Sequence, residues 1–119
     1  MSLTSRFTLN LMGGSVGFSF TPEAARELQA AISALLASLK VVGAKTATAG
    51  VSQKLPQKPM EYQHAGEVFL EVFCNPNIWP TPFAARALIT LRDERIRLST
   101  EIELTQMIED INQYLEQVG

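Results

Sequence analysis

The stretch FTLNLMGGSVGFSF, residues 7–20, decides the start of the fold, because apolar and polar side chains alternate on both sides of a glycine pair. Alternation with a period of two is typical of strands that bury one face, and paired glycines between them indicate a hairpin turn. A two-residue turn at Gly13 and Gly14 predicts one apolar face across the hairpin. The pairs expected on that face are Phe7 with Phe20, Leu9 with Phe18 and Leu11 with Val16.

A helix is expected directly after this hairpin. Thr21 can cap its amino end, and Pro22 suits its first position because proline has no N–H to satisfy there. Apolar residues then recur at helical spacing, and Gly43 is placed to end the helix, so we predict a helix over about 22–40. The apolar stripe consists of Ala24, Ala25, Leu28, Ala31, Ile32, Leu35, Leu36 and Leu39.

The next segment is a basic stretch without a sustained period, which predicts a long loop over about 41–60. Every lysine of the chain lies between positions 40 and 60, where no acidic residue occurs. Residues 1–60 carry six basic and two acidic side chains (net +4), whereas residues 61–119 carry four basic and ten acidic ones (net −6). Lys45, Lys54 and Lys58 could therefore bind an acidic partner or a phosphate group, keep the loop soluble, or lie on the acidic last helix.

A third strand is expected over about 67–74, and both of its faces are partly apolar. This pattern indicates an inner strand packed on each side, or a strand whose Phe69 and Phe73 face is given to a partner. Several prolines then enforce a loop that contains Ile78, Trp79 and Phe83. Large apolar groups in a proline-rigidified loop either pack onto the core or act as interface anchors.

The carboxyl-terminal third predicts a second hairpin over about 86–100 and a last helix. A symmetric turn, of two residues or of the four residues 92–95, pairs Leu91 with Ile96. Thr100 with Glu103 matches a capping box at the start of the helix. The alternative is that the strand continues through Ile102.

The resulting order, ββαβββα, predicts a single α+β domain over residues 1–119, with a largely antiparallel five-stranded sheet and two main helices. This order resembles that of longin and profilin-like domains, and more loosely that of the type III secretion chaperones. The resemblance is one of topology. It implies a binding or regulatory scaffold that is often dimeric.

Composition narrows the chemistry that the chain can support. Cys74 is the single cysteine, so no internal disulfide or cysteine metal cluster can form, and a reducing cytoplasmic compartment is favoured. His64 is the single histidine, so histidine-based catalysis or metal binding would depend on one side chain; a solvated loop or strand-edge role is favoured. The net charge of −2 gives no global attraction to nucleic acid, and the apolar run at 30–39 is too short to span a bilayer.

We therefore expect a non-enzymatic protein-interaction module, such as an adaptor, assembly factor or small accessory subunit, that binds a protein partner and self-associates, for example as a homodimer. One alternative is a small-ligand-binding protein or minor enzyme with a pocket beside residues 43–60 and His64 at its rim. The other is a weak nucleic-acid binder, which is disfavoured because no aromatic residues are interleaved with the lysines. No catalytic, cofactor-binding or metal-binding residue is predicted. The candidate interaction surface consists of Ile78, Trp79, Phe83, Lys45, Lys54 and Lys58.

Overall fold

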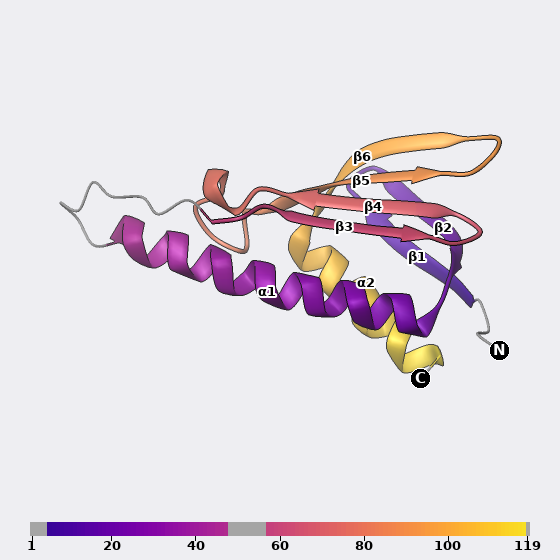
Figure 1. Ribbon diagram of the computed structural model, residues 1–119, viewed down its shortest axis with the longest axis horizontal. Coiled ribbons are helices and arrows are strands. Elements are labelled where there is room, and N and C mark those ends of the chain that lie inside the picture. Colours follow the sequence, from indigo (N-terminus) through magenta and orange to yellow (C-terminus); the bar gives the residue numbers. More distant parts are fainter. Residues whose placement is uncertain (1–4, 48–56, 119) are drawn as a thin grey trace.

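The computed structural model describes residues 5–47 and 57–118, and it has the predicted α+β class (Figure 1). The expected single five-stranded sheet is wrong, because the strands form two antiparallel sheets, β1-β2 and β3-β4-β5-β6. The elements in chain order are β1 (Ser5–Leu11), β2 (Gly14–Phe20), α1 (Pro22–Ala47), β3 (Met60–Ala65), β4 (Phe69–Cys74), the 3-10 helix η1 (Pro76–Ile78), β5 (Arg86–Arg92), β6 (Arg97–Glu103) and α2 (Leu104–Val118).

The strand missing from the sequence prediction is β3, which forms one edge of the larger sheet. Met60 and Tyr62 are buried in the core, whereas Glu61 and Gln63 are exposed. This alternation is short, and it directly follows a polar segment, so its period does not stand out. The additional strand also changes the order on which the resemblance to longin and profilin-like domains depends.

The hairpin β1-β2 has the predicted apolar face, but its register differs by two residues from the predicted one. Phe7 pairs with Phe18 rather than with Phe20, and the turn consists of Met12 and Gly13. A slip of two residues leaves every side chain on its expected face, so the burial pattern cannot distinguish the two registers. In the observed register the ring of Phe7 lies 5.4 Å from that of Phe18 and 5.2 Å from that of Phe20.

Helix α1 begins as predicted and ends later than predicted. The main-chain N–H of Ala24 donates to Thr21 Oγ1 at 3.2 Å, which is the expected N-cap bond. The helix then continues through Gly43 to Ala47, so the first part of the expected loop at 41–60 is helical. Glycine inside a helix costs only about 1 kcal/mol relative to alanine, so one glycine does not have to end a helix.

The hairpin β5-β6 has a four-residue turn that begins at Asp93, one residue later than predicted. Leu91 consequently pairs with Leu98 rather than with Ile96. Asp93 Oδ1 accepts hydrogen bonds from the main-chain N–H groups of Arg95 at 2.8 Å and Ile96 at 2.9 Å. These bonds lower the pKa of Asp93 and fix the turn at this position.

Helix α2 starts at Leu104, because β6 continues through Ile102 as the alternative interpretation allowed. The predicted capping box does not form, since Thr100 and Glu103 both belong to β6. Instead the main-chain N–H of Leu104 donates to the carbonyl oxygen of Ala85 at 3.0 Å. This bond ties the start of α2 to the segment that precedes β5.

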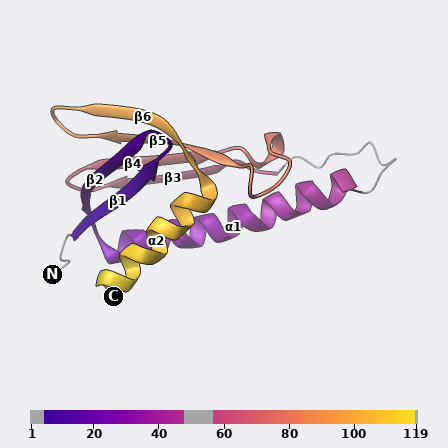
Figure 2. The same ribbon diagram turned by 180° about the vertical axis from the view of Figure 1, so that it is seen from behind.

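The helices lie together on one side of the four-stranded sheet, as Figures 1 and 2 show from opposite directions. α1 packs against β3, and α2 packs against α1, β1 and β6. One continuous core of buried apolar side chains joins these elements, with Leu28, Ile89, Ile102 and Met107 fully buried in it. The core therefore occupies only one face of the larger sheet.

An aromatic cluster connects the hairpin to both α2 and the larger sheet. The ring of Phe7 lies 5.1 Å from that of Tyr114 on α2, and the ring of Phe20 lies edge-on, 5.3 Å from that of His64 on β3. Aromatic pairs at such distances contribute about 0.5–1.5 kcal/mol each beyond their burial. Side-chain packing, rather than a continuous hydrogen-bonded sheet, thus joins β1-β2 to β3-β6.

A buried carboxylate reinforces the contact between β1 and α2. Asp110 is only 3% exposed. Its two carboxylate oxygens accept hydrogen bonds from Asn10 N and Asn10 Nδ2, both at 2.8 Å, and from Gln106 Nε2 at 2.9 Å. Burial of a carboxylate is costly unless such bonds replace its water, so this network must be complete to stabilise the fold.

We predict that Asp110→Ala lowers the free energy of unfolding by about 2 kcal/mol, because the partly buried N–H groups of Asn10 would lose their acceptor. Urea denaturation measures this change. The matched control is Glu109→Ala, which removes an exposed neighbouring carboxylate and should change stability by less than about 0.5 kcal/mol. Equal stabilities of the two variants would show that the network contributes little.

Tyr62 joins β3 to α1 through a hydrogen bond from its hydroxyl to the carbonyl oxygen of Ala24, at 3.0 Å. Burial, with a smaller contribution from the charge of Glu27, raises the pKa of Tyr62 to about 12. The folded state therefore disfavours the phenolate. This contribution to stability is complete below the unfolded pKa of about 10 and is lost as the pH rises toward the folded value.

We predict that the free energy of unfolding falls between about pH 10 and pH 12, and that the fall is smaller in Tyr62→Phe. Burial also raises the pKa of Tyr114, so the variant should retain part of the dependence. Urea denaturation at a series of alkaline pH values tests this. Parallel profiles for the two proteins would contradict a role for Tyr62.

Candidate interaction surface

The side of the β3–β6 sheet that faces away from the helices is here called the outer face. Because side chains alternate along a strand, it carries every second residue of each strand. The strand register arranges these residues in rows that cross all four strands. The acidic row is Glu61, Phe73, Leu88 and Glu101; the middle row is Gln63, Glu71, Thr90 and Ser99; the basic row is Ala65, Phe69, Arg92 and Arg97.

The acidic row has an apolar centre. Phe73 and Leu88 pair directly on the two inner strands, and they are 36% and 45% exposed. Glu61 and Glu101 flank them on the edge strands, and both are exposed. Other apolar side chains of the described surface are more exposed, but they lie in loops and turns, whereas Phe73 and Leu88 are adjacent on inner strands, where large apolar side chains are ordinarily covered.

The polar side chains of the middle row form hydrogen bonds with one another. Gln63 Nε2 donates to Glu71 Oε2 at 2.7 Å, and the hydroxyls of Thr90 and Ser99 lie 3.1 Å apart. Thr90 is only 7% exposed although it lies on the outer face, because its neighbours cover it. This row therefore presents a closely packed polar strip between the two charged rows.

The basic row combines an aromatic ring with two cations. The guanidinium carbon of Arg92 lies 4.3 Å from the ring centroid of Phe69, which is a cation–π contact. Arg97 pairs with Arg92 across β5 and β6, and both side chains are exposed. Beyond the acidic row, Arg86 of β5 pairs with Glu103 of β6, and both are exposed. Across the three rows, the outer face carries glutamates toward one end and arginines toward the other, with apolar groups at both ends.

The three apolar residues predicted in the loop between β4 and β5 differ in their exposure. Ile78 and Phe83 are 65% and 81% exposed, whereas Trp79 is half-buried against the core. The side chain of Asn77 holds this loop, since it accepts from Gln57 N at 2.7 Å and donates to Gln57 O at 2.8 Å. Ile78 and Phe83 therefore remain candidate contact residues, and Trp79 has mainly a packing role.

The predicted lysine site is mostly outside the part of the chain that the structure describes. Lys54 lies outside the described residues. Lys45 lies in the last turns of α1, but its side chain is not described. Lys58 is exposed just before β3. The acidic surface of the last helix, which was expected to attract these lysines, has one charge fewer, because Asp110 is buried and bonded to Asn10.

His64 and Cys74 both lie on the core side of the sheet. His64 is half-buried beside Phe20 and sits at the end of β3 away from residues 57–59. Burial raises the pKa of the Cys74 thiol. Within the described chain, no three His, Cys, Asp or Glu side chains are grouped so that they could hold a metal ion.

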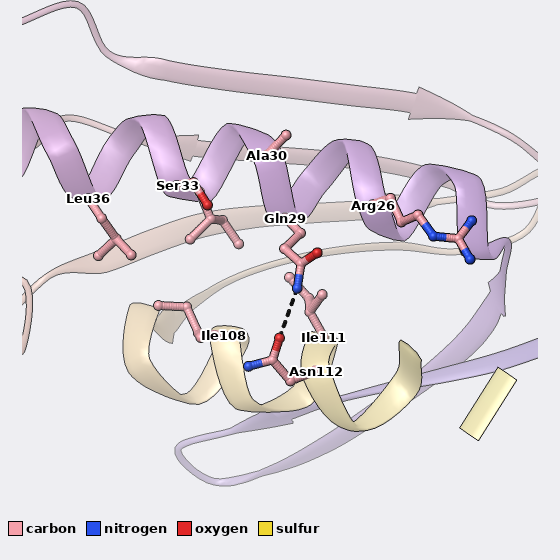
Figure 3. A pocket seen from close by; sticks show the side chains of 9 residues that line it. Arg26, Gln29, Ala30, Ser33, Leu36, Ile108, Ile111 and Asn112 are labelled. Atoms are coloured by element: carbon pink, nitrogen blue, oxygen red, sulfur yellow. Dashed lines mark hydrogen bonds between the residues drawn. The ribbon is translucent and has the colours of Figure 1, made fainter. Parts of the chain in front are cut away.

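A shallow groove of about 350 Å³ lies between the two helices. Gln29 Nε2 on α1 donates to Asn112 Oδ1 on α2 at 3.0 Å and bridges it, as Figure 3 shows. Leu36 and Ile108 line one end of the groove and Arg26 lines the other. Ser33 also lines the groove, but the lining residues include no general base that could activate its hydroxyl, so the groove is suited to weak packing and hydrogen bonding.

The sequence pattern indicates part of the outer face. It predicts that Phe69 and Phe73 can face a partner, but it indicates no role for Leu88, Glu101 or Arg97. These residues form one surface only through the register of β4, β5 and β6. An apolar residue on the polar face of β5 was the available signal for Leu88.

No protein-family model matches this chain, and comparison with curated proteins and with solved structures finds no significant similarity. Among residues 5–47 and 57–118, no helix has the length and apolar character needed to cross a membrane. Inference about function therefore depends on the geometry of the outer face and of the cavities.

We predict that Cys74 reacts slowly with thiol reagents in the folded protein, because it is buried and its raised pKa leaves less thiolate at a given pH. Labelling followed by mass spectrometry near pH 8 should be slow without urea and fast at a urea concentration that unfolds the chain. Equal rates in the two conditions would show that the thiol is accessible.

Proposed function

We propose that this chain is a non-enzymatic protein-interaction module, acting as an adaptor, assembly factor or small accessory subunit, and that the outer face binds its protein partner. The observation that carries this proposal is the exposed pair Phe73 and Leu88 on the inner strands of the sheet. Burial of such side chains releases about 25 cal/mol for each Å² of apolar surface removed from water. A protein surface is the occupant that can cover an extended face of four strands.

The composition of the outer face supports a protein partner over a nucleic acid. Glu61, Glu71 and Glu101 surround the apolar centre, and their charges would repel phosphate groups. Arg92 and Arg97 lie at the opposite end of the face, and Arg86 at the near end is paired across the strands with Glu103. Mixed charges around exposed apolar side chains are typical of interfaces whose rim sets the orientation of the partner.

The small-ligand alternative has less support from the described residues. His64, its expected rim residue, packs on Phe20 at the end of β3 away from residues 57–59. The groove between the helices is open, and Gln29 and Asn112 already satisfy each other in part. We therefore place the functional surface on the sheet.

Site-specific photocrosslinking tests the proposal. A photoreactive benzoylphenylalanine at position 88 of the full chain should capture a discrete protein when added to extract of the source cells, because this position is the centre of the outer face. The same group at position 105, an exposed site on α2, is the matched control and should not capture that protein. Phe73→Ser in the position-88 protein should strongly reduce capture.

The contrary results are equally specific. Equal capture from positions 88 and 105 would show non-specific contact, and no adduct from position 88 would remove the outer face as the binding surface. Circular dichroism of each variant shows whether the fold is retained, which we expect because position 88, position 105 and Phe73 are all exposed.

A further inference from the structure

We infer that the partner of the outer face is a second copy of this chain, packed face to face about a two-fold axis that crosses the strands along the middle row. This inference rests on the proposed function, since it assumes that the outer face binds a protein. Its basis is the charge pattern of the face. When one copy is rotated by 180° about this axis, its acidic row lies over the basic row of the other copy. Two-fold homodimers are the commonest closed assemblies of soluble proteins.

The rows specify which side chains would meet. Adjacent rows are two residues apart along a strand, about 7 Å, and packed sheets are about 10 Å apart. Rotation about the proposed axis places the acidic row of one copy over the basic row of the other. Phe73 then lies over Phe69 of the second copy, and Glu101 lies over Arg97 of the second copy, and each contact occurs twice.

The contacts expected from this placement are chemically matched. Phe73 and Phe69 form aromatic pairs, and Leu88 covers the aliphatic stem of Arg92, whose guanidinium already stacks on its own Phe69. Glu101 and Arg97 form ion pairs at the rim, where they set orientation more than affinity. The natural twist of sheets rotates the two strand directions by about 30°, which these long side chains can accommodate.

Charge distinguishes this axis from the other simple two-fold, which runs along the strands. That second axis would place Glu61 over Glu101 of the other copy twice, and it would form no opposite-charge pair from the acidic row. The proposed axis has one like-charge contact, Glu71 with Glu71 of the second copy, and it leaves Glu61 opposite Ala65 without a cation. The like-charge contact is moderated, because Gln63 Nε2 already donates to each Glu71 carboxylate.

The size of the face sets the expected strength. Four strands about 4.8 Å apart and seven residues about 3.4 Å long give a footprint of roughly 450 Å². Tight complexes bury about 800 Å² on each partner. The face is therefore small for a stable interface, and we expect a weak dimer that is visible only when protein concentration is varied.

Sedimentation equilibrium of the purified full chain over a range of concentrations tests the inference. We expect a reversible monomer–dimer equilibrium whose dissociation constant rises about tenfold or more in Phe73→Ser, because each dimer contains this contact twice. The matched control is Met12→Ser at the β1-β2 turn, which removes a side chain that is 63% exposed and should leave the equilibrium unchanged. Equal weakening by both variants would indicate non-specific association.

A charge exchange identifies the axis. Glu101→Arg alone and Arg97→Glu alone should each weaken the dimer, since each places like charges opposite one another. The double variant should restore it, because residues 97 and 101 lie four positions apart on one strand, about 14 Å, and can pair only between copies. Glu71→Gln should strengthen the dimer by removing the charge repulsion on the axis.

Each outcome separates this inference from the function on which it rests. A strict monomer at all concentrations overturns the second copy as partner, whereas capture of a different protein from position 88 would still support the interaction module. A dimer that persists in Phe73→Ser would mean that another surface self-associates. A dimer lost in Phe73→Ser but not restored by the charge exchange would overturn the proposed axis.

Discussion

The packing of Phe7 is the interaction on which the arrangement of this fold depends. Its ring contacts Phe18 and Phe20 within the hairpin and Tyr114 on α2, and Phe20 in turn meets His64 on β3. No strand pairing joins the two sheets, so these rings, with the Asp110 network, hold the hairpin in place. The position of the hairpin then determines which side of the larger sheet is covered.

The uncovered outer face is a direct consequence of that arrangement. The hairpin and both helices all contribute to one core, and the described chain has no further element to place on the opposite side of β3–β6. An antiparallel sheet tolerates a solvated face when that face is polar. Here Phe73 and Leu88 interrupt the polar face at the two inner strands, which a purely structural sheet does not require.

The sequence indicated which face of each strand or helix is buried better than it indicated which residues pair across neighbouring strands. Alternation identified the buried sides of β1, β2, β5 and the last helix, because a period of two or 3.6 is a local property. Register was wrong in both hairpins by two residues, since that slip preserves every face. The short strand β3 and the division into two sheets depend on contacts between distant segments, and Leu88 with Glu101 became a site only once β5 and β6 were aligned.

The charge pattern of the outer face explains how exposed apolar groups could give specific rather than indiscriminate association. Phe73 and Leu88 supply the favourable burial, but glutamates flank them on both edge strands. A partner that covers these carboxylates without cations at matching positions loses part of the favourable apolar burial to their desolvation. In the proposed dimer the basic row, 13–14 Å away by the spacing of about 3.4 Å per residue, supplies Arg97 to Glu101 and leaves Glu61 on the edge strand opposite Ala65.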